Sequence, residues 1–237
     1  PARTPLIVAC GLTAYTVWMA VTTAWAPSGG SAWMAAGRSA TYVLVFLLTS
    51  TMCRAKSGRI ALKYGLAAAA AVLVVTCVWK LIATSDIASM FVEDRLAYPV
   101  GYPNNAAALY LIPFWPLLWM AADPREKWYL RGLILGLSTA LVMLAYLTQS
   151  RGAFWAFALS TVAFFLLSPA RLRALAHLAV VLGATILAYP ALNLYWAEGP
   201  AAVGVAPLLT RFIPCTVAAI AVGWIVSLLD PRLRFTR

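Results

Sequence analysis

The sequence predicts an all-α protein, a polytopic transmembrane helix bundle of about eight spans. Of its 237 residues, 63% are hydrophobic and only 11% are charged, so a soluble fold would lack the polar side chains needed to cover its core. Apolar stretches of roughly 20 residues, the length that crosses a bilayer as a helix, recur along the chain. The alternating pattern typical of a membrane β-barrel is nowhere visible.

The spans are expected near residues 5–25, 34–53, 61–83, 104–122, 132–149, 152–168, 175–196 and 208–229. Residues 1–237 would then form a single integral membrane domain. The longest connection runs from about Thr84 to Pro103, which is too short for a soluble domain.

The first span is too long, and too polar at its start, for a simple signal peptide. The second span is predicted from its apolar composition alone. The third contains the run from Ala67 to Ala71, whose small side chains favour close helix packing. The fourth contains Pro113 and Pro116, either of which could break the helix, although proline is tolerated in membrane helices.

The fifth and sixth spans are joined only by the segment from Thr148 to Gly152, which predicts a tight hairpin. The seventh contains Pro190, another candidate break. The eighth follows a short connection from about Ala197 to Pro207 and is followed by a basic segment.

The charges predict the orientation of the bundle. The formal net charge of +11 would suggest nucleic-acid binding in a soluble protein, but in so apolar a chain it indicates basic cytoplasmic loops and no nucleic-acid partner. Alternate connections hold thirteen of the eighteen Lys and Arg residues: Arg3, Arg54, Lys56, Arg59, Lys63, Arg125, Lys127, Arg131, Arg171, Arg173, Arg232, Arg234 and Arg237. Both termini are therefore expected in the cytoplasm.

Neither cysteine nor histidine patterns indicate a metal site. The four cysteines, Cys10, Cys53, Cys77 and Cys215, are scattered and form no CxxC motif, so we expect reduced thiols that pack as small apolar side chains. His177 is the only histidine, which excludes a histidine-rich zinc cluster.

Arg95 belongs to the small set of basic residues expected on the outer side. Apolar residues between Ile87 and Leu96 suggest a short helix on the membrane surface. The prolines and glycine that follow predict a turn, after which Asn104 or Asn105 can cap the fourth span. A simple ion pair of Arg95 with Glu93 or Asp94 is the alternative, since surface charge pairs are common.

Arg151 occupies the outer hairpin between two apolar helices. An arginine at this depth is costly unless it reaches water, anions or carbonyl groups. Its planar guanidinium suits a phosphate group, Gly152 allows a sharp turn, and Ser150 or Gln149 could donate to an anion or cap the next helix. The alternative is an arginine that only anchors the hairpin at the interface.

Three further polar residues have simpler interpretations. Arg211 and Lys80 could each supply another positive group on the outer side, but each is also an ordinary interfacial anchor. His177 lies on the inner side and is expected near the start of a helix, not as a catalytic base.

Two segments together resemble the O-antigen ligase and O-antigen polymerase superfamily, whose members handle undecaprenyl-linked glycans outside the cytoplasmic membrane. The first is Arg95-Leu96 followed by the segment from Gly101 to Ala107, and the second is the Ser-Arg-Gly hairpin at residues 147–153. The resemblance is concentrated between residues 95 and about 167.

The resemblance implies a GT-C-like, metal-independent glycosyltransferase without a cofactor, in a bacterial cytoplasmic membrane. Arg95 and Arg151 would bind the diphosphate of a lipid-linked glycan donor. The supporting residues would be Ser150, Gly152, Asn104, Asn105 and Arg211, and the catalytic residue is unidentified. Its other partners would be a glycan or lipid acceptor and membrane lipids.

The chain departs from the family in length. Members usually have about twelve spans and a large late outer loop that carries a histidine or other essential polar residues. Here the connection near residues 197–207 is short, and His177 lies on the other side. We therefore expect an N-terminal part of a longer protein, in which the active site is incomplete; a degenerate member of the family is the alternative. The alternative functions are a transporter or flippase for a lipid-linked or anionic solute, and a non-catalytic scaffold.

Overall fold

The computed structural model describes residues 3–168 and 171–233, so Arg234 and Arg237 of the expected basic segment lie outside the described residues. The chain divides into two compact units, residues 1–65 and 66–237, and each is described by itself. The elements are α1 (Arg3–Thr22), α2 (Gly29–Met52), α3 (Lys56–Ala83), the 3₁₀ turn η1 (Ile87–Met90), β1 (Phe91–Val92), β2 (Arg95–Leu96), α4 (Pro103–Leu111), α5 (Phe114–Ala122), α6 (Trp128–Leu147), α7 (Arg151–Leu167), α8 (Arg171–Ala197), α9 (Pro200–Val203), the π-helical turn η2 (Leu208–Phe212) and α10 (Ile213–Leu233).

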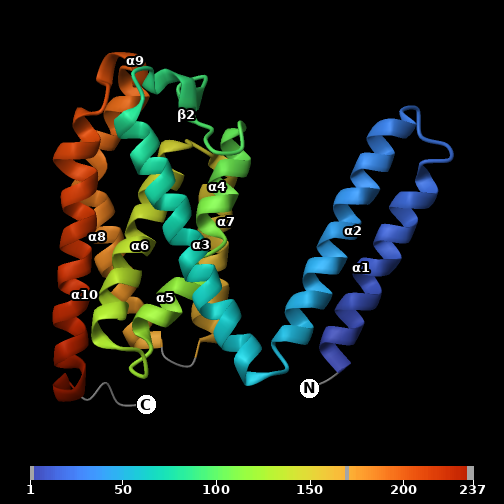
Figure 1. Ribbon diagram of the computed structural model, residues 1–237, viewed down its shortest axis with the longest axis horizontal. Coiled ribbons are helices and arrows are strands. Elements are labelled where there is room, and N and C mark those ends of the chain that lie inside the picture. The colour runs from blue at the N-terminus through green and yellow to red at the C-terminus, as the bar shows by residue number, and fades with distance from the viewer. Residues whose placement is uncertain (1–2, 169–170, 234–237) are drawn as a thin grey trace. The chain divides into compact units, whose positions relative to one another are not determined.

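The predicted all-α bundle is confirmed (Figure 1). Within the described part of the chain, seven helical stretches have the length and apolar composition to cross a membrane, with α4 and α5 together counted as one. The eighth expected span is α7, which is apolar but has only 17 residues. At 1.5 Å per residue it is about 25 Å long, slightly less than the hydrocarbon core of a bilayer.

The first unit contains α1 and α2, which pack against each other as a helical hairpin. The hydroxyl groups of Thr16 and Ser39 lie 2.7 Å apart and form a hydrogen bond between the two helices. Such bonds add to the association of apolar helices, because lipid offers the hydroxyl groups no other partner. At the end of α2, Arg59 donates to the carbonyl of Cys53 at 2.8 Å and holds the turn into α3.

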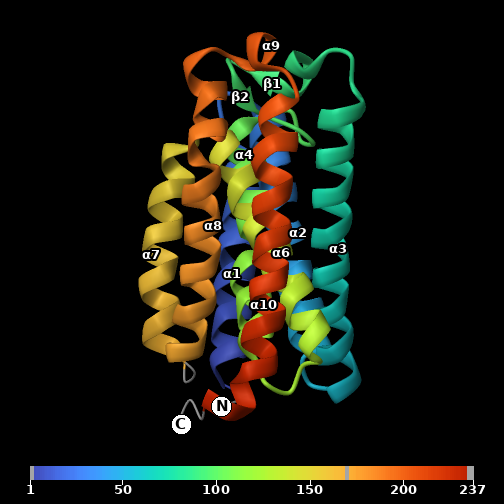
Figure 2. The same cartoon turned by 90° about the vertical axis from the view of Figure 1, so that its left-hand side faces the viewer.

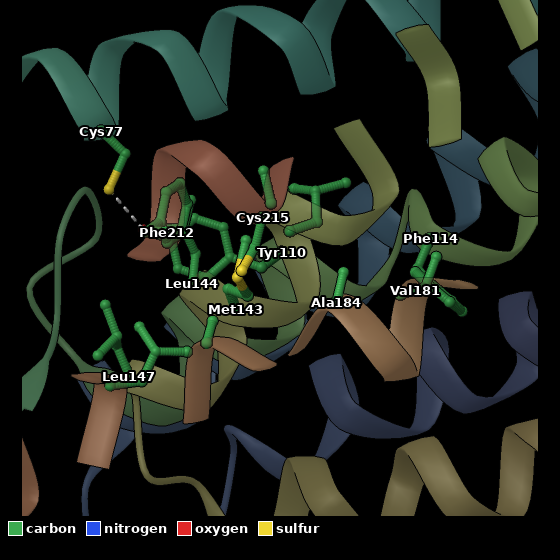
Figure 3. Packing of buried hydrophobic residues seen from close by; sticks show 14 of the residues in the cluster. Cys77, Tyr110, Phe114, Met143, Leu144, Leu147, Val181, Ala184, Phe212 and Cys215 are labelled. Atoms are coloured by element: carbon green, nitrogen blue, oxygen red, sulfur yellow. Dashed lines mark hydrogen bonds between the residues drawn. The ribbon is translucent and has the colours of Figure 1, made fainter. Parts of the chain in front are cut away.

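In the second unit α6 is the central helix and contacts α4, α5, α8 and α10. Large apolar side chains from these helices fill the core around it, among them Tyr110, Phe114, Leu144 and Phe212 (Figure 3). The Tyr110 hydroxyl donates to the carbonyl of Tyr98 at 2.6 Å, and the Cys77 thiol lies 3.3 Å from the same hydroxyl. The core thus ties α3 and the connection before α4 to the bundle.

Glycines allow α6 and α10 to approach closely. A Cβ atom on Gly223 would lie 2.8 Å from the Cα of Gly132, and a Cβ on Gly132 would contact the ring of Trp224. The Trp224 indole N–H also donates to the carbonyl of Tyr129 at 2.9 Å. Small residues at such contacts let helix backbones meet, the usual way in which membrane helices gain packing energy.

One of the three candidate proline breaks is confirmed. The fourth span is divided into α4 and α5, with Pro113 at the N-cap of α5. Pro116 lies within the first turn of α5, where a missing N–H costs little. Pro190 lies inside α8, which continues through it.

The expected surface helix between Ile87 and Leu96 is wrong. After the short turn η1, β1 and β2 form an antiparallel hairpin in which Phe91 pairs with Leu96. Glu93 and Asp94 form its two-residue turn with φ of 50° and 58°, the left-handed geometry of a tight hairpin turn. Phe91 and Leu96 are both buried, so these apolar residues mark paired strands and not one face of a helix.

Three connections meet at one end of the second unit, which we call the hairpin end: the β1–β2 hairpin, the turn Thr148–Ser150 between α6 and α7, and α9 (Figures 1 and 2). The ring of Phe91 stacks on that of Tyr195 near the end of α8, with centroids 5.8 Å apart. The Tyr195 hydroxyl donates to the carbonyl of Gly204 at 2.7 Å. The hairpin is therefore packed against α8 and the connection that follows it.

Candidate functional site

Arg95 lies on β2 and is half-buried at the hairpin end. Its Nε–H donates to the carbonyl of Thr148 at 3.1 Å, and its Nη2 donates to the side-chain oxygen of Asn104 at 2.9 Å. The guanidinium thus bonds across the fold to the α6–α7 turn, and the alternative of an ion pair with Glu93 or Asp94 is wrong. Among the described residues, the Nη1 group and one N–H of Nη2 have no hydrogen-bond acceptor, so they can donate to a ligand.

A second bond runs in the opposite direction between the same two segments. The side-chain amide of Gln149 donates to the carbonyl of Asp94 at 3.0 Å, while Arg95 donates to Thr148. We call this reciprocal pair of bonds the arginine clasp. It joins the hairpin that carries Arg95 to the turn that leads into Arg151.

The backbone of the α6–α7 turn reverses at Gln149, not at Gly152. Gln149 has a φ of 53°, in the left-handed region, and its side chain and backbone are held by the clasp and by α6. Gly152 is the second residue of α7, and a Cβ added there would meet nothing within 4 Å. The expectation that Gly152 provides the sharp turn is therefore wrong.

The expected capping role of Asn104 and Asn105 is also wrong. The N-cap of α4 is Tyr102, and Pro103 follows it at the first helical position, where a proline loses no hydrogen bond. Asn104 instead accepts from Arg95, and its amide donates to the Tyr102 hydroxyl at 3.3 Å. Asn105 is exposed on the first turn of α4, away from both contacts of the Arg95 guanidinium.

The expected capping role of Ser150 is confirmed. Its hydroxyl oxygen accepts from the backbone N–H of Ala153 at 3.2 Å, which caps α7. Arg151 is then the first residue of α7 and is exposed. A cation is unfavourable at a helix N-terminus, because the unpaired N–H groups there already carry partial positive charge. An anion bound at this point would be stabilised both by the Arg151 guanidinium and by the unpaired N–H groups of the helix.

Replacing Ser150 by alanine should lower the free energy of unfolding by about 1 kcal/mol, because the Ala153 N–H would lose its acceptor. Thermal unfolding in detergent would measure this loss. Asn is an equally good N-cap, so Ser150→Asn should keep most of the stability. Equal losses in both variants would show that the cap bond is not the cause.

A cavity of about 320 Å³ lies beside Arg151. Its polar lining residues, Gln149, Ser150 and Arg151, come from one turn, and Thr185 adds a hydroxyl from α8. The rest of the wall is apolar or aromatic: Leu111, Val142, Ala145, Tyr146, Ala153, Phe154, Trp155, Phe157 and Trp196. This arrangement fits an amphipathic ligand, with its charged group at Arg151 and apolar atoms along the helices.

The β1–β2 hairpin also lies next to Gly199, which precedes α9. Gly199 has a φ of 79°, and a Cβ added to it would lie 3.1 Å from a carboxylate oxygen of Asp94. The glycine therefore both permits the backbone geometry and leaves room for the side chain of the hairpin turn. All three connections of the hairpin end are thus fixed relative to one another.

The remaining candidate residues lie elsewhere. Arg211 is exposed on the π-helical turn η2, and no hydrogen bond of the described residues joins it to Arg95 or Arg151. Lys80 is exposed on α3. His177 is buried in the second turn of α8, at the opposite end of that helix from Trp196, and its Nδ1 lies 2.8 Å from the Arg173 carbonyl.

The expected absence of disulfides agrees with the structure, in which all four cysteines are free thiols. Cys10 and Cys53 are exposed, whereas Cys77 and Cys215 are buried. Among residues 3–168 and 171–233, no group of three or more His, Cys, Asp or Glu side chains is placed to hold a metal ion.

Sequence reasoning missed several members of the site. The Thr148 carbonyl that accepts from Arg95 could not be predicted, because every residue has a backbone carbonyl. Tyr146 and Trp196, which line the cavity beside Arg151, were not predicted as members of the site. Asn193, whose side-chain oxygen lies 3.4 Å from the Tyr146 hydroxyl, could have been detected, because an amide within an apolar span is uncommon.

The chain was compared with models of protein families, with curated proteins and with solved structures, and no match was found in any of the three.

Proposed function

We propose that this chain is an O-antigen ligase-like or polymerase-like membrane glycosyltransferase, or part of one, that acts on glycans linked to a lipid diphosphate. Arg95 and Arg151 would bind the diphosphate. The arginine clasp carries the proposal: it fixes the Arg95 guanidinium on the backbone of Thr148, three residues before Arg151. The cavity beside Arg151 would receive the part of the donor next to the diphosphate.

The chemistry needs such a site. In glycosyl transfer an acceptor hydroxyl oxygen attacks the anomeric carbon, the bond from that carbon to the diphosphate oxygen breaks, and the diphosphate leaves with the electron pair. The positive charges of the two guanidinium groups would stabilise the negative charge that develops on this leaving group. A general base must take the hydroxyl proton, and we assign no residue to that step.

The placement in the membrane follows from the charge distribution. The hairpin end would face the outside of a bacterial cytoplasmic membrane, with the basic connections and both termini in the cytoplasm. In this arrangement α7 also crosses the membrane, and its 17 residues lie at the lower limit of spanning lengths. The helical bundle would then belong to the GT-C-like class, with the site at the membrane surface where lipid-linked glycans are exposed.

Arg95→Ala tests the proposal through glycan transfer by the full-length protein in proteoliposomes. We expect at least about a tenfold loss of transfer, because the variant removes a charged donor and releases the turn before Arg151. Arg38→Ala is the matched control, since Arg38 is an exposed arginine of α2 outside the site. Transfer that is equal in both variants would refute a role of Arg95 in binding the donor.

A transporter or flippase remains the second candidate, and the break between α4 and α5 favours it. Broken helices often hold the substrates of secondary transporters near the bilayer centre. However, Ile112 and Pro113 at this break are apolar, and the neighbouring core residues Phe114 and Leu117 are apolar too. Flux of a lipid-linked solute in proteoliposomes without glycosyl transfer would favour the transporter over the enzyme.

A further inference from the structure

A cluster of three aromatic rings and one amide lies beside the arginine turn. The ring of Tyr146 stacks on that of Trp196, with centroids 5.6 Å apart and planes 14° from parallel. The rings of Tyr189 and Tyr146 meet edge-on, with centroids 5.8 Å apart. Asn193 lies on α8 between Tyr189 and Trp196 in the sequence, so α8 presents the three side chains within two turns.

Asn193 is the unusual member of this cluster. The Tyr146 hydroxyl donates to its side-chain oxygen at 3.4 Å, a long bond, and the Nδ2 group donates to no acceptor in the described part of the chain. An amide within an apolar helix at membrane depth is costly when its donors lack partners. Packing or anchoring at the interface would be served equally well by an apolar or aromatic residue.

The cluster lies at the depth of the arginine turn. Tyr146 and Trp196 line the same cavity as Gln149 and Arg151. Asn193 precedes Ala197, the last residue of α8, by four residues, or about 6 Å along the helix axis. A group attached directly to an anion at Arg151 would therefore lie near the rings of Tyr146 and Trp196, and Asn193 adjoins them through the hydrogen bond from the Tyr146 hydroxyl.

We propose that Tyr146, Asn193 and Trp196 bind the sugar ring that is attached directly to the diphosphate of the donor. A sugar ring has apolar C–H faces that pack on aromatic rings, and hydroxyl groups that accept hydrogen bonds from an amide N–H. The half-exposed Trp196 supplies the aromatic surface, and the Nδ2 group of Asn193 supplies two donors. This inference rests on the proposed function and assigns the sugar subsite within it.

Binding of two probes tests the sugar subsite. One probe is undecaprenyl diphosphate without a sugar, and the other is undecaprenyl diphosphate linked to N-acetylglucosamine; both are titrated into the full-length protein in detergent. Asn193→Ala and Trp196→Leu should each weaken binding of the sugar-bearing probe about tenfold, because each removes one contact to the ring. Binding of the bare diphosphate should stay unchanged in Asn193→Ala, because Asn193 does not line the cavity beside Arg151. Trp79→Leu, at an exposed tryptophan of α3, is the matched control and should change neither.

The outcomes separate the two proposals. Equal effects of Asn193→Ala on both probes, or no effect on either, would overturn the sugar subsite while leaving the diphosphate site intact. If the unmodified protein bound neither probe, the proposed function would fail and the subsite with it. Asn193→Gln, which keeps an amide, should retain more of the sugar-dependent affinity than Asn193→Ala, and the reverse order would also overturn the subsite.

Discussion

Replacement of Arg151 by alanine should reduce glycan transfer by the full-length protein at least about a hundredfold, while membrane insertion stays intact. Its guanidinium is exposed at the start of α7, where it adds to the partial positive charge of the helix end. Loss of a fixed charge that stabilises a leaving group has effects of about this size in other enzymes. Initial rates with a lipid-linked donor in proteoliposomes would measure the loss.

Arg151→Lys separates charge from geometry in the same assay. Lysine keeps the positive charge but cannot form the paired N–H contacts of a guanidinium with phosphate oxygens. We expect this variant to remain well below the unmodified protein. Full activity with either lysine or alanine at this position would contradict the assignment of Arg151 to the diphosphate.

Gly132→Ala and Gly223→Ala should each lower the free energy of unfolding by about 1–3 kcal/mol. A Cβ on Gly223 would lie 2.8 Å from the Cα of Gly132, and a Cβ on Gly132 would lie 2.7 Å from the carbonyl oxygen of Ile220. Both neighbours are backbone atoms, so α6 and α10 would have to move apart. Thermal unfolding in detergent would measure the change.

Gly183→Ala is the control for these two variants. Gly183 lies inside α8, and a Cβ added there would meet nothing within 4 Å. Alanine has the higher helix propensity, so this variant should be as stable as the unmodified protein or slightly more so. If Gly132→Ala and Gly223→Ala were as stable as Gly183→Ala, close contact of α6 and α10 would not be needed for the fold.

The helices were predictable because each depends on a local property, a long apolar stretch that lipid or neighbouring helices can cover. The one break that forms, at Pro113, was among the three that the prolines suggested. The sequence did not distinguish it from Pro190, which stays inside α8. That difference depends on packing around each proline, which a local pattern does not describe.

The candidate site was only partly predictable. The cap at Ser150 depends on residues three apart, and it was found. The β1–β2 hairpin was mistaken for a helix because the apolar residues of so short a segment fit the period of a helix as well as that of a strand. The arginine clasp joins residues more than fifty positions apart through backbone carbonyls, so no residue pattern indicates it.

The central claim is that Arg95 and Arg151 bind one diphosphate together, and a double-mutant cycle on undecaprenyl diphosphate binding tests it most directly. The dissociation constants of the full-length protein, Arg95→Ala, Arg151→Ala and the double variant would be compared. Groups that contact one ligand are coupled, so the double variant should lose less affinity than the two single losses together. Unchanged affinity in all three variants, or fully additive losses, would contradict a shared site.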